Sequence, residues 1–123
     1  MTGAILVVDD NSYVREVLTD ILVSVAATVF TAANGQEGLE ILQQERQNIG
    51  LVLLDMNMPV MNGEQTYEKL QEIAPDVKVI VSTSLSQAEV QSRFKHRKLP
   101  PLLQKPFNVD TLLNVVQTEL AMA

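Results

Sequence analysis

The sequence predicts a small α/β domain in which helices cover both faces of a parallel sheet. Short apolar runs alternate five times with segments whose apolar residues recur every three or four positions, which is the pattern of strands followed by amphipathic helices. The run at residues 51–54 contains no polar residue, as is typical of a strand buried on both faces of a parallel sheet. No repeat or change in composition divides the 123 residues, so residues 1–123 are expected to form one domain.

The first half of the chain contains two predicted strand–helix units. Residues 4–8 are rich in β-branched side chains and form the first strand, after which Asn11 and Ser12 can cap a helix. The buried stripe of that helix is expected to be Val14, Val17, Leu18, Ile21, Leu22 and Val25, and its water-facing side Arg15, Glu16, Thr19 and Asp20. Residues 28–32 form the second strand, and the pair Asn34-Gly35 then turns the chain into a helix. The inward residues of this second helix are Leu39, Ile41 and Leu42.

Three further units are predicted in the second half. The third strand ends at Asp55, and the pair Asn62-Gly63 leads into a helix that Pro75 ends. The inward residues of that helix are Tyr67, Leu70 and Ile73. The remaining elements are a fourth strand at 77–81, a polar, basic helix from 87 to roughly 98 that Pro100-Pro101 ends, and a fifth strand at 102–104. The last helix can be capped by Asn108 and Asp110, and its buried stripe is expected to be Val109, Leu112, Leu113, Val116 and Leu120.

Composition and charge exclude several classes of function. The absence of cysteine excludes disulfides and thiolate metal sites, and it makes a cytoplasmic location the default expectation. The net charge of −6 argues against direct nucleic-acid binding, which requires a basic surface to displace counterions from phosphates. No apolar run approaches the roughly 20 residues of a membrane-spanning helix, so we expect no membrane insertion by this chain.

Polar residues of a reactive type follow four of the five predicted strands. Asp9 and Asp10 follow the first strand, Asp55 the third, Thr83 the fourth and Lys105 the fifth. Ligands of open α/β sheets bind at the carboxyl ends of the strands, and in a flavodoxin-like order, 2-1-3-4-5, these four strands are neighbours. The sequence therefore predicts that the five side chains meet at one edge of a doubly wound, five-stranded sheet.

The chemistry of this set favours a phosphoryl group and a divalent cation. Three carboxylates brought close together repel one another, and each would have a raised pKa unless a cation neutralised the cluster. Oxygen ligands without cysteine favour Mg²⁺. A lysine ammonium group and a threonine hydroxyl are suited to phosphate oxygens. Asp55, on the central strand, is best placed to act as a nucleophile that accepts a phosphoryl group as an acyl phosphate.

These residues, in this order and with these gaps, resemble the response-regulator receiver domains of two-component signalling. The motifs are Asp9-Asp10, the segment from Asp55 to Pro59 with Gly63 after it, Thr83, and Lys105-Pro106-Phe107. The resemblance implies that Asp55 takes a phosphoryl group from a phosphohistidine of a histidine kinase or a histidine phosphotransfer protein. It also implies a receiver that promotes its own phosphorylation and dephosphorylation and is not a free-standing enzyme.

The resemblance assigns a role to each matching residue. It implies that Asp10 and Asp55 bind Mg²⁺ directly, Asp9 largely through water, and Asn57 through its backbone carbonyl. It further implies that Thr83 and Lys105 bind phosphoryl oxygens, often after a cis Lys105–Pro106 bond. Phosphorylation is then expected to alter the face formed by the last two helices and the fifth strand, which binds a downstream protein target or an output domain.

The sequence departs from the family pattern in three places. Leu102 stands where the family usually has an aromatic residue coupled to the threonine, and Ser84 replaces the usual alanine. The segment 99–101 replaces a loop that commonly contains glycine. Residues 93–107 are most similar to receivers attached to hybrid sensor kinases.

Two alternatives follow from the same residues. The first is a Mg²⁺-dependent phosphatase or phosphotransferase that turns over a small substrate through Asp55, although no insertion is long enough to supply a specificity cap. The second is a degenerate receiver that acts only as a docking module, which the replacement of the aromatic by Leu102 leaves open.

Overall fold

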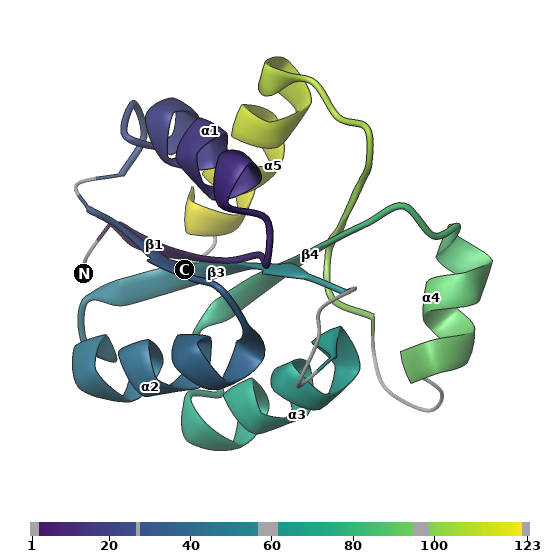
Figure 1. The fold of residues 1–123 in the computed structure, drawn as a ribbon, viewed down its shortest axis with the longest axis horizontal. Coiled ribbons are helices and arrows are strands. Elements are labelled where there is room, and N and C mark those ends of the chain that lie inside the picture. The colour runs from purple at the N-terminus through teal and green to yellow at the C-terminus, as the bar shows by residue number, and fades with distance from the viewer. Residues whose placement is uncertain (1–2, 27, 57–61, 95–98, 122–123) are drawn as a thin grey trace.

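The computed structural model describes residues 3–26, 28–56, 62–94 and 99–121, and it confirms the predicted fold class. Five parallel strands form one sheet in the order β2-β1-β3-β4-β5 (Figure 1). The strands are β1 (Ala4–Val8), β2 (Val29–Ala32), β3 (Ile49–Asp55), β4 (Lys78–Thr83) and β5 (Leu102–Gln104). The helices are α1 (Ser12–Leu22), α2 (Gly35–Glu45), α3 (Gly63–Ile73), α4 (Gln87–Phe94) and α5 (Val109–Ala121).

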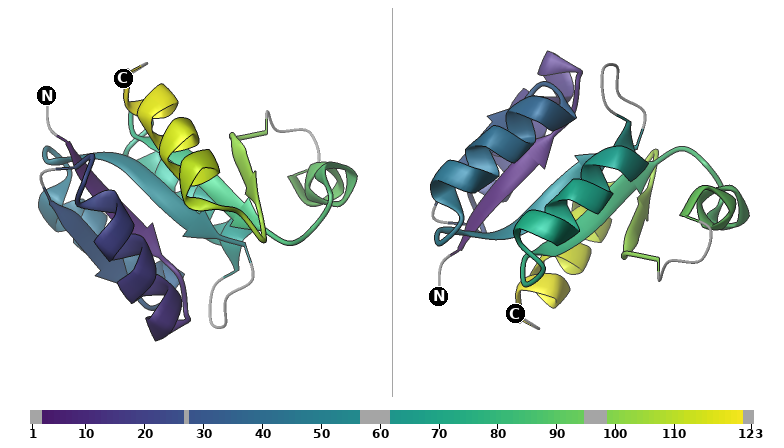
Figure 2. Two further views of the ribbon diagram at one scale, coloured as in Figure 1. Left: turned by 90° about the horizontal axis from the view of Figure 1, so that it is seen from above. Right: turned by 90° about the horizontal axis from the view of Figure 1, so that it is seen from below.

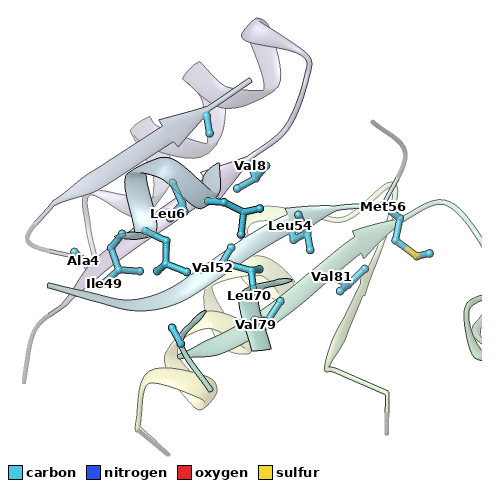
Figure 3. Packing of buried hydrophobic residues seen from close by; sticks show 14 of the residues in the cluster. Ala4, Leu6, Val8, Ile49, Val52, Leu54, Met56, Leu70, Val79 and Val81 are labelled. Carbon is cyan, nitrogen blue, oxygen red and sulfur yellow. The ribbon is translucent and has the colours of Figure 1, made fainter. Parts of the chain in front are cut away.

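The helices form two layers, one on each face of the sheet. Helices α1 and α5 cover one face and α2 and α3 the other, while α4 stands beside the β4–β5 edge (Figures 1 and 2). Alternate residues of the buried strands face opposite layers: Leu51 and Leu53 of β3 pack with α1 and α5, and Val52 and Leu54 with the other helices. Figure 3 shows the second of these cores, in which Leu70 of α3 lies against the sheet. The central strand therefore belongs to two separate hydrophobic cores.

Asparagine side chains cap the start of α1, α2, α3 and α5, as predicted for the first and the last. The Asn11 carboxamide oxygen accepts hydrogen bonds from the backbone N–H groups of Tyr13 and Val14. The same interaction occurs at Asn34 and Asn62, and the Asn108 oxygen accepts from the N–H of Thr111. Among the alternative caps, Ser12 is the first residue of α1 and Asp110 lies in the first turn of α5.

Several element boundaries differ from the predictions. Strand β3 begins at Ile49, two residues before the apolar run that starts at Leu51. Its pairing with β1 continues past Gly50 to Ile49 with a shift in register, whereas in the sequence this glycine interrupts the apolar run. Strand β4 runs on to Thr83 rather than ending at residue 81, because it continues to pair with β5. Helix α4 ends at Phe94 among the described residues, and its predicted extension through residues 95–98 lies outside them.

Helical periodicity assigns Val17 and Val109 to buried stripes, and this prediction is wrong for both. Val17 is 37% exposed because it lies at the margin of the stripe, whose centre is formed by Leu18 and Leu22. Val109 is 48% exposed at the first residue of α5, where the helix has not yet reached the sheet. The core positions of these helices are nevertheless those expected, since Leu112 and Val116 are fully buried.

Glycine 38 lies where α2 comes close to the sheet. A Cβ atom at this position would be 2.9 Å from a methyl group of Val8 in β1. Glycine inside a helix costs about 1 kcal/mol relative to alanine, and the close packing of α2 on β1 gives the reason for its presence. None of the helices in the described part of the chain has both the length and the apolar character needed to cross a bilayer.

Candidate functional site

The sheet brings the four predicted polar strand ends together at one edge. Strands β1, β3, β4 and β5 are consecutive neighbours, and because they are parallel, their carboxyl ends lie on the same side. Asp9 directly follows β1, Asp55 and Thr83 are the last residues of β3 and β4, and Lys105 directly follows β5. The strand without a reactive residue, β2, is the outer neighbour of β1, as the predicted order requires.

Three carboxylates form the acidic part of the site. Each of Asp9, Asp10 and Asp55 offers one oxygen atom, and these atoms lie within 4.8 Å of one another. Asp9 and Asp55 are only 3% and 4% exposed, whereas Asp10 is exposed. Oxygen donors of high negative charge that open to solvent on one side fit a hard divalent cation that keeps part of its water shell. The cluster is therefore a candidate cation site.

Lysine 105 places a positive charge beside the two buried members of this cluster. Its Nζ donates a hydrogen bond to Asp55 Oδ1 at 3.3 Å and lies 3.8 Å from Asp9 Oδ2. The side chain is 34% exposed, so the ammonium group is accessible to an incoming anion. The bond that follows it, Lys105–Pro106, is cis, as the resemblance implies. Lys105 is therefore in direct contact with Asp55, which lies 50 residues earlier in the sequence, and forms an ion pair with Asp9.

Threonine 83 is fully buried at the end of β4. Its carbonyl oxygen accepts from the N–H of Lys105 at 2.7 Å, which fixes the end of β5 beside β4. Its side-chain Oγ1 accepts from the N–H of Leu85 at 3.0 Å. A hydroxyl group has one hydrogen and two acceptor positions, so this contact leaves the hydrogen of Thr83 for another acceptor.

Two residues that support Asp9 were not identified from the sequence. The backbone N–H of Asn11 donates to Asp9 Oδ1 at 2.9 Å, and an Arg15 guanidinium nitrogen donates to the Asp9 carbonyl oxygen at 2.7 Å. Arg15 is half-buried, contrary to the prediction that it faces water. The signal for this contact is positional, because α1 starts three residues after Asp9 and its first turn returns residue 15 toward the strand end.

The chain after Asp55 returns to the strand end at Gly63. The N–H of Gly63 donates to the carbonyl oxygen of Met56 at 2.9 Å, and a Cβ atom at Gly63 would lie 2.6 Å from the Met56 Cα. Only glycine permits this approach, which brings the start of α3 against the end of β3. Asn57, predicted to offer its carbonyl to the cation, lies outside the described residues.

The fold and the site together define a phosphoacceptor domain, and comparison with known proteins gives the same answer. The model of the response regulator receiver domain family matches residues 5–117. The chain belongs to this family, and it is accordingly a receiver domain that acts as a phosphoacceptor switch in signalling, not a free-standing enzyme.

Individual relatives are similar over the whole chain. The chain is 30% identical to the sporulation initiation phosphotransferase F of Bacillus subtilis, over 99% of this chain and 97% of the relative. The structure of the chemotaxis protein CheY4 of Vibrio cholerae matches with a TM-score of 0.85 and 28% identity, covering 96% of this chain and 98% of that one.

A third match is the complex of CheX and CheY with BeF3 and Mg²⁺ from Borrelia burgdorferi, with a TM-score of 0.85, 26% identity and 94% and 87% coverage. In seven further curated relatives, the chain spans between 11% and 50% of the relative's length. The receiver domain thus occurs in this family both as nearly the whole of a protein and as a small part of one.

Proposed function

We propose that Asp55 is the residue that accepts the phosphoryl group. The observation that carries this proposal is the 3.3 Å contact between Lys105 Nζ and Asp55 Oδ1 within the acid cluster. Asp9 is a weaker candidate because one of its carboxylate oxygens accepts the Asn11 N–H. Asp10 is a weaker candidate because it is exposed and has no ion pair with Lys105 among the described residues.

The transfer is a displacement at phosphorus. A carboxylate oxygen of Asp55 attacks the phosphorus of a phosphohistidine, the new P–O bond forms as the N–P bond breaks, and the electron pair of that bond leaves with the imidazole. Lys105 is near enough to Asp55 to donate to an oxygen of the transferred group. Thr83, with its oxygen already accepting the Leu85 N–H, is suited to donate its hydroxyl hydrogen to another oxygen.

Asp9, Asp10 and Asp55 are the proposed ligands of Mg²⁺, and the Asn57 carbonyl remains a predicted fourth. The oxygen-only donor set fits this ion, as does the exposed position of Asp10, which leaves coordination positions to water or phosphate. When bound, Mg²⁺ supplies positive charge that neutralises the transferring oxygens. Arg15 and the Asn11 N–H hold Asp9 in its place in this set.

The proposed phosphodonor is a histidine kinase or a histidine phosphotransfer protein. Tyr13 is 72% exposed and Val17 37%, and a spacing of four residues places them on one side of α1. Helix α1 begins three residues after Asp9, so this apolar patch lies beside the acid cluster and can dock the donor.

We place the contact with a downstream target or output domain on the surface of α4, β5 and α5. The net charge of −6 supports protein partners and no direct nucleic-acid binding, and we propose a cytoplasmic location.

Modification with a small phosphodonor tests the proposal. With Mg²⁺ and acetyl phosphate, we expect the mass of one phosphoryl group to be added to the wild-type chain, and none to be added to Asp55→Asn. The matched control is Asp20→Asn, which removes the same charge from an exposed position of α1 and should leave modification intact. Equal labelling of Asp55→Asn and wild type would overturn the assignment.

The cavity found in the described part of the chain gives no support to the small-molecule phosphatase alternative. A cavity of about 790 Å³ lies where β4 and β5 begin, lined by residues such as Tyr67, Lys78 and Leu102, and none of the three acids lines it. Sustained release of inorganic phosphate from small phosphomonoesters, lost in Asp55→Asn, would support this alternative instead.

A further inference from the structure

The main chain of Leu85 is held on both sides of its Cα atom. Its N–H donates to Thr83 Oγ1 at 3.0 Å, and its carbonyl oxygen accepts from the Gln104 side-chain Nε2 at 2.8 Å. The next residue, Ser86, accepts from the N–H of Glu89 and so caps α4. Leu85 is therefore fixed between the buried threonine of the site and the start of α4.

Gln104 is placed for this contact by the pairing of β5 with β4. Gln104 is the register partner of Thr83, and its chain neighbour Lys105 donates to the Thr83 carbonyl oxygen. Leu103 belongs to the core beneath α1 and α5, whereas Leu102 packs against the opposite core. Since side chains alternate along a strand, Gln104 lies on the same face as Leu102, and Leu85 of the segment joining β4 to α4 packs against the core on that face.

The double contact at Leu85 determines how the Thr83 hydroxyl can be used. While Oγ1 accepts the Leu85 N–H, the hydroxyl hydrogen has to point elsewhere, so Thr83 is oriented as a donor. That orientation depends on the backbone of Leu85 staying in place. Gln104 is the side chain that anchors the carbonyl of this residue to β5.

We propose that Gln104 is a positioning residue for the phosphoryl site. It acts through Leu85 to hold the Thr83 hydroxyl in the orientation that donates to a phosphoryl oxygen on Asp55. The proposal rests on the proposed function of Asp55 and Thr83 and adds a residue that touches neither the acids nor the transferred group. In this account Leu102, which stands where the family usually has an aromatic residue, is not needed to link β5 to Thr83.

Variants of Gln104 that differ only in the donor test the proposal. Gln104→Met keeps the length of the side chain without a donor, Gln104→Glu replaces the donor with an acceptor, and Gln104→Arg retains a donor. A hydrogen bond such as this one contributes a net free energy of about 0.5–1.5 kcal/mol, which corresponds to a change of about two- to tenfold in a binding constant. We expect the affinity for beryllofluoride in Mg²⁺ to fall by that factor in Gln104→Met and Gln104→Glu and to be restored in Gln104→Arg.

A double-mutant cycle separates positioning from a general loss of stability. In a Thr83→Ala background no hydroxyl remains to be oriented, so Gln104→Met should cause no further loss of beryllofluoride affinity. An equal loss in both backgrounds would overturn the proposal and give Gln104 a purely structural role. An unchanged affinity in the wild-type background would also overturn it.

The unmodified protein provides a readout that does not depend on phosphorylation. In Gln104→Met, the amide hydrogen of Leu85 should exchange with solvent faster than in the wild type, and its NMR signal should shift. In Gln104→Arg, the exchange rate and the signal of the same amide should stay as in the wild type. If the wild type fails to bind beryllofluoride, the proposed function fails. If it binds and the Leu85 amide does not respond to Gln104→Met, only the positioning role fails.

Discussion

At the scale of single residues, the site depends on contacts that only particular side chains allow. Lys105 reaches Asp55 and Asp9 from the end of a strand only three residues long, and Gly63 lets the start of α3 touch the main chain at Met56. The reactive residues themselves were predictable, because each lies within two residues of the end of an apolar run. Arg15 and Gln104 were not predictable, because each donates to a backbone carbonyl, and a carbonyl carries no sequence signal.

Gly63→Ala should destabilise the chain even though alanine favours helices. The added Cβ would lie 2.6 Å from the Met56 Cα, a backbone atom that cannot rotate away. Overpacking of this kind lowers the free energy of unfolding by about 1–3 kcal/mol, which urea unfolding would measure. Lys69→Ala, at an exposed position of the same helix, is the control and should change it by less than about 0.5 kcal/mol. A Gly63→Ala midpoint equal to that of the wild type would contradict the close approach.

At the scale of elements, helix α4 stands beside the β4–β5 edge and belongs to neither helical layer (Figures 1 and 2). Its buried residues are Val90 and Phe94, and the Phe94 ring contacts Tyr67 of α3 edge to face with 5.3 Å between ring centroids. An ion pair between Arg93 and Glu64 adds a second, half-exposed link to α3. The sequence predicted a helix here with a polar, basic surface, but it could not give the partners of Val90 and Phe94.

The start of α4 is held by a reciprocal cap, and we predict a pH dependence for it. The N–H of Ser86 donates to the Glu89 carboxylate at 3.0 Å, and chiefly this bond, together with the Ser86 side chain, holds the pKa of Glu89 below its ordinary value of 4.5. Since the folded pKa is lowered, the contribution to stability is complete above the ordinary value and is lost as the pH falls through the folded one.

NMR titration of the Glu89 side chain measures this pKa directly. In Ser86→Ala, the backbone N–H remains but the side-chain bond is lost, so we expect the pKa of Glu89 to rise toward its ordinary value. A Glu89 pKa that is already ordinary in the wild type, or that does not respond to Ser86→Ala, would contradict the cap.

At the scale of the whole molecule, the sheet order converts five separate sequence signals into one site. The alternation of strands and helices predicted the doubly wound architecture, and the reactive strand ends were consistent with the order that the structure has. The predicted set of Asp9, Asp10, Asp55, Thr83 and Lys105 is found at one edge. The exposure of Val17 and Val109 could not be predicted, because periodicity identifies the direction of a stripe but not how far the sheet extends beneath it.

The acid cluster predicts that Mg²⁺ stabilises the folded chain. An ion that binds only the folded state adds RT ln(1 + [L]/Kd), or about 1.4 kcal/mol at ten times Kd. Thermal unfolding at constant ionic strength should therefore give a Tm that rises with Mg²⁺. Asp10→Asn removes one of three mutually repelling carboxylates, so its Tm without Mg²⁺ should be above that of the wild type and should rise less when Mg²⁺ is added. A Tm independent of Mg²⁺ in the wild type would contradict the cation site.

The uneven burial of the three carboxylates also determines which charged groups a partner meets first. Asp9 and Asp55 are almost completely enclosed, and the exposed members of the set are Asp10 and part of Lys105. Among the described residues of the set, a partner therefore meets Asp10 and Lys105 before it reaches the enclosed Asp55. These two side chains carry opposite charges, so the entrance to the site presents an anion and a cation side by side to whatever approaches it.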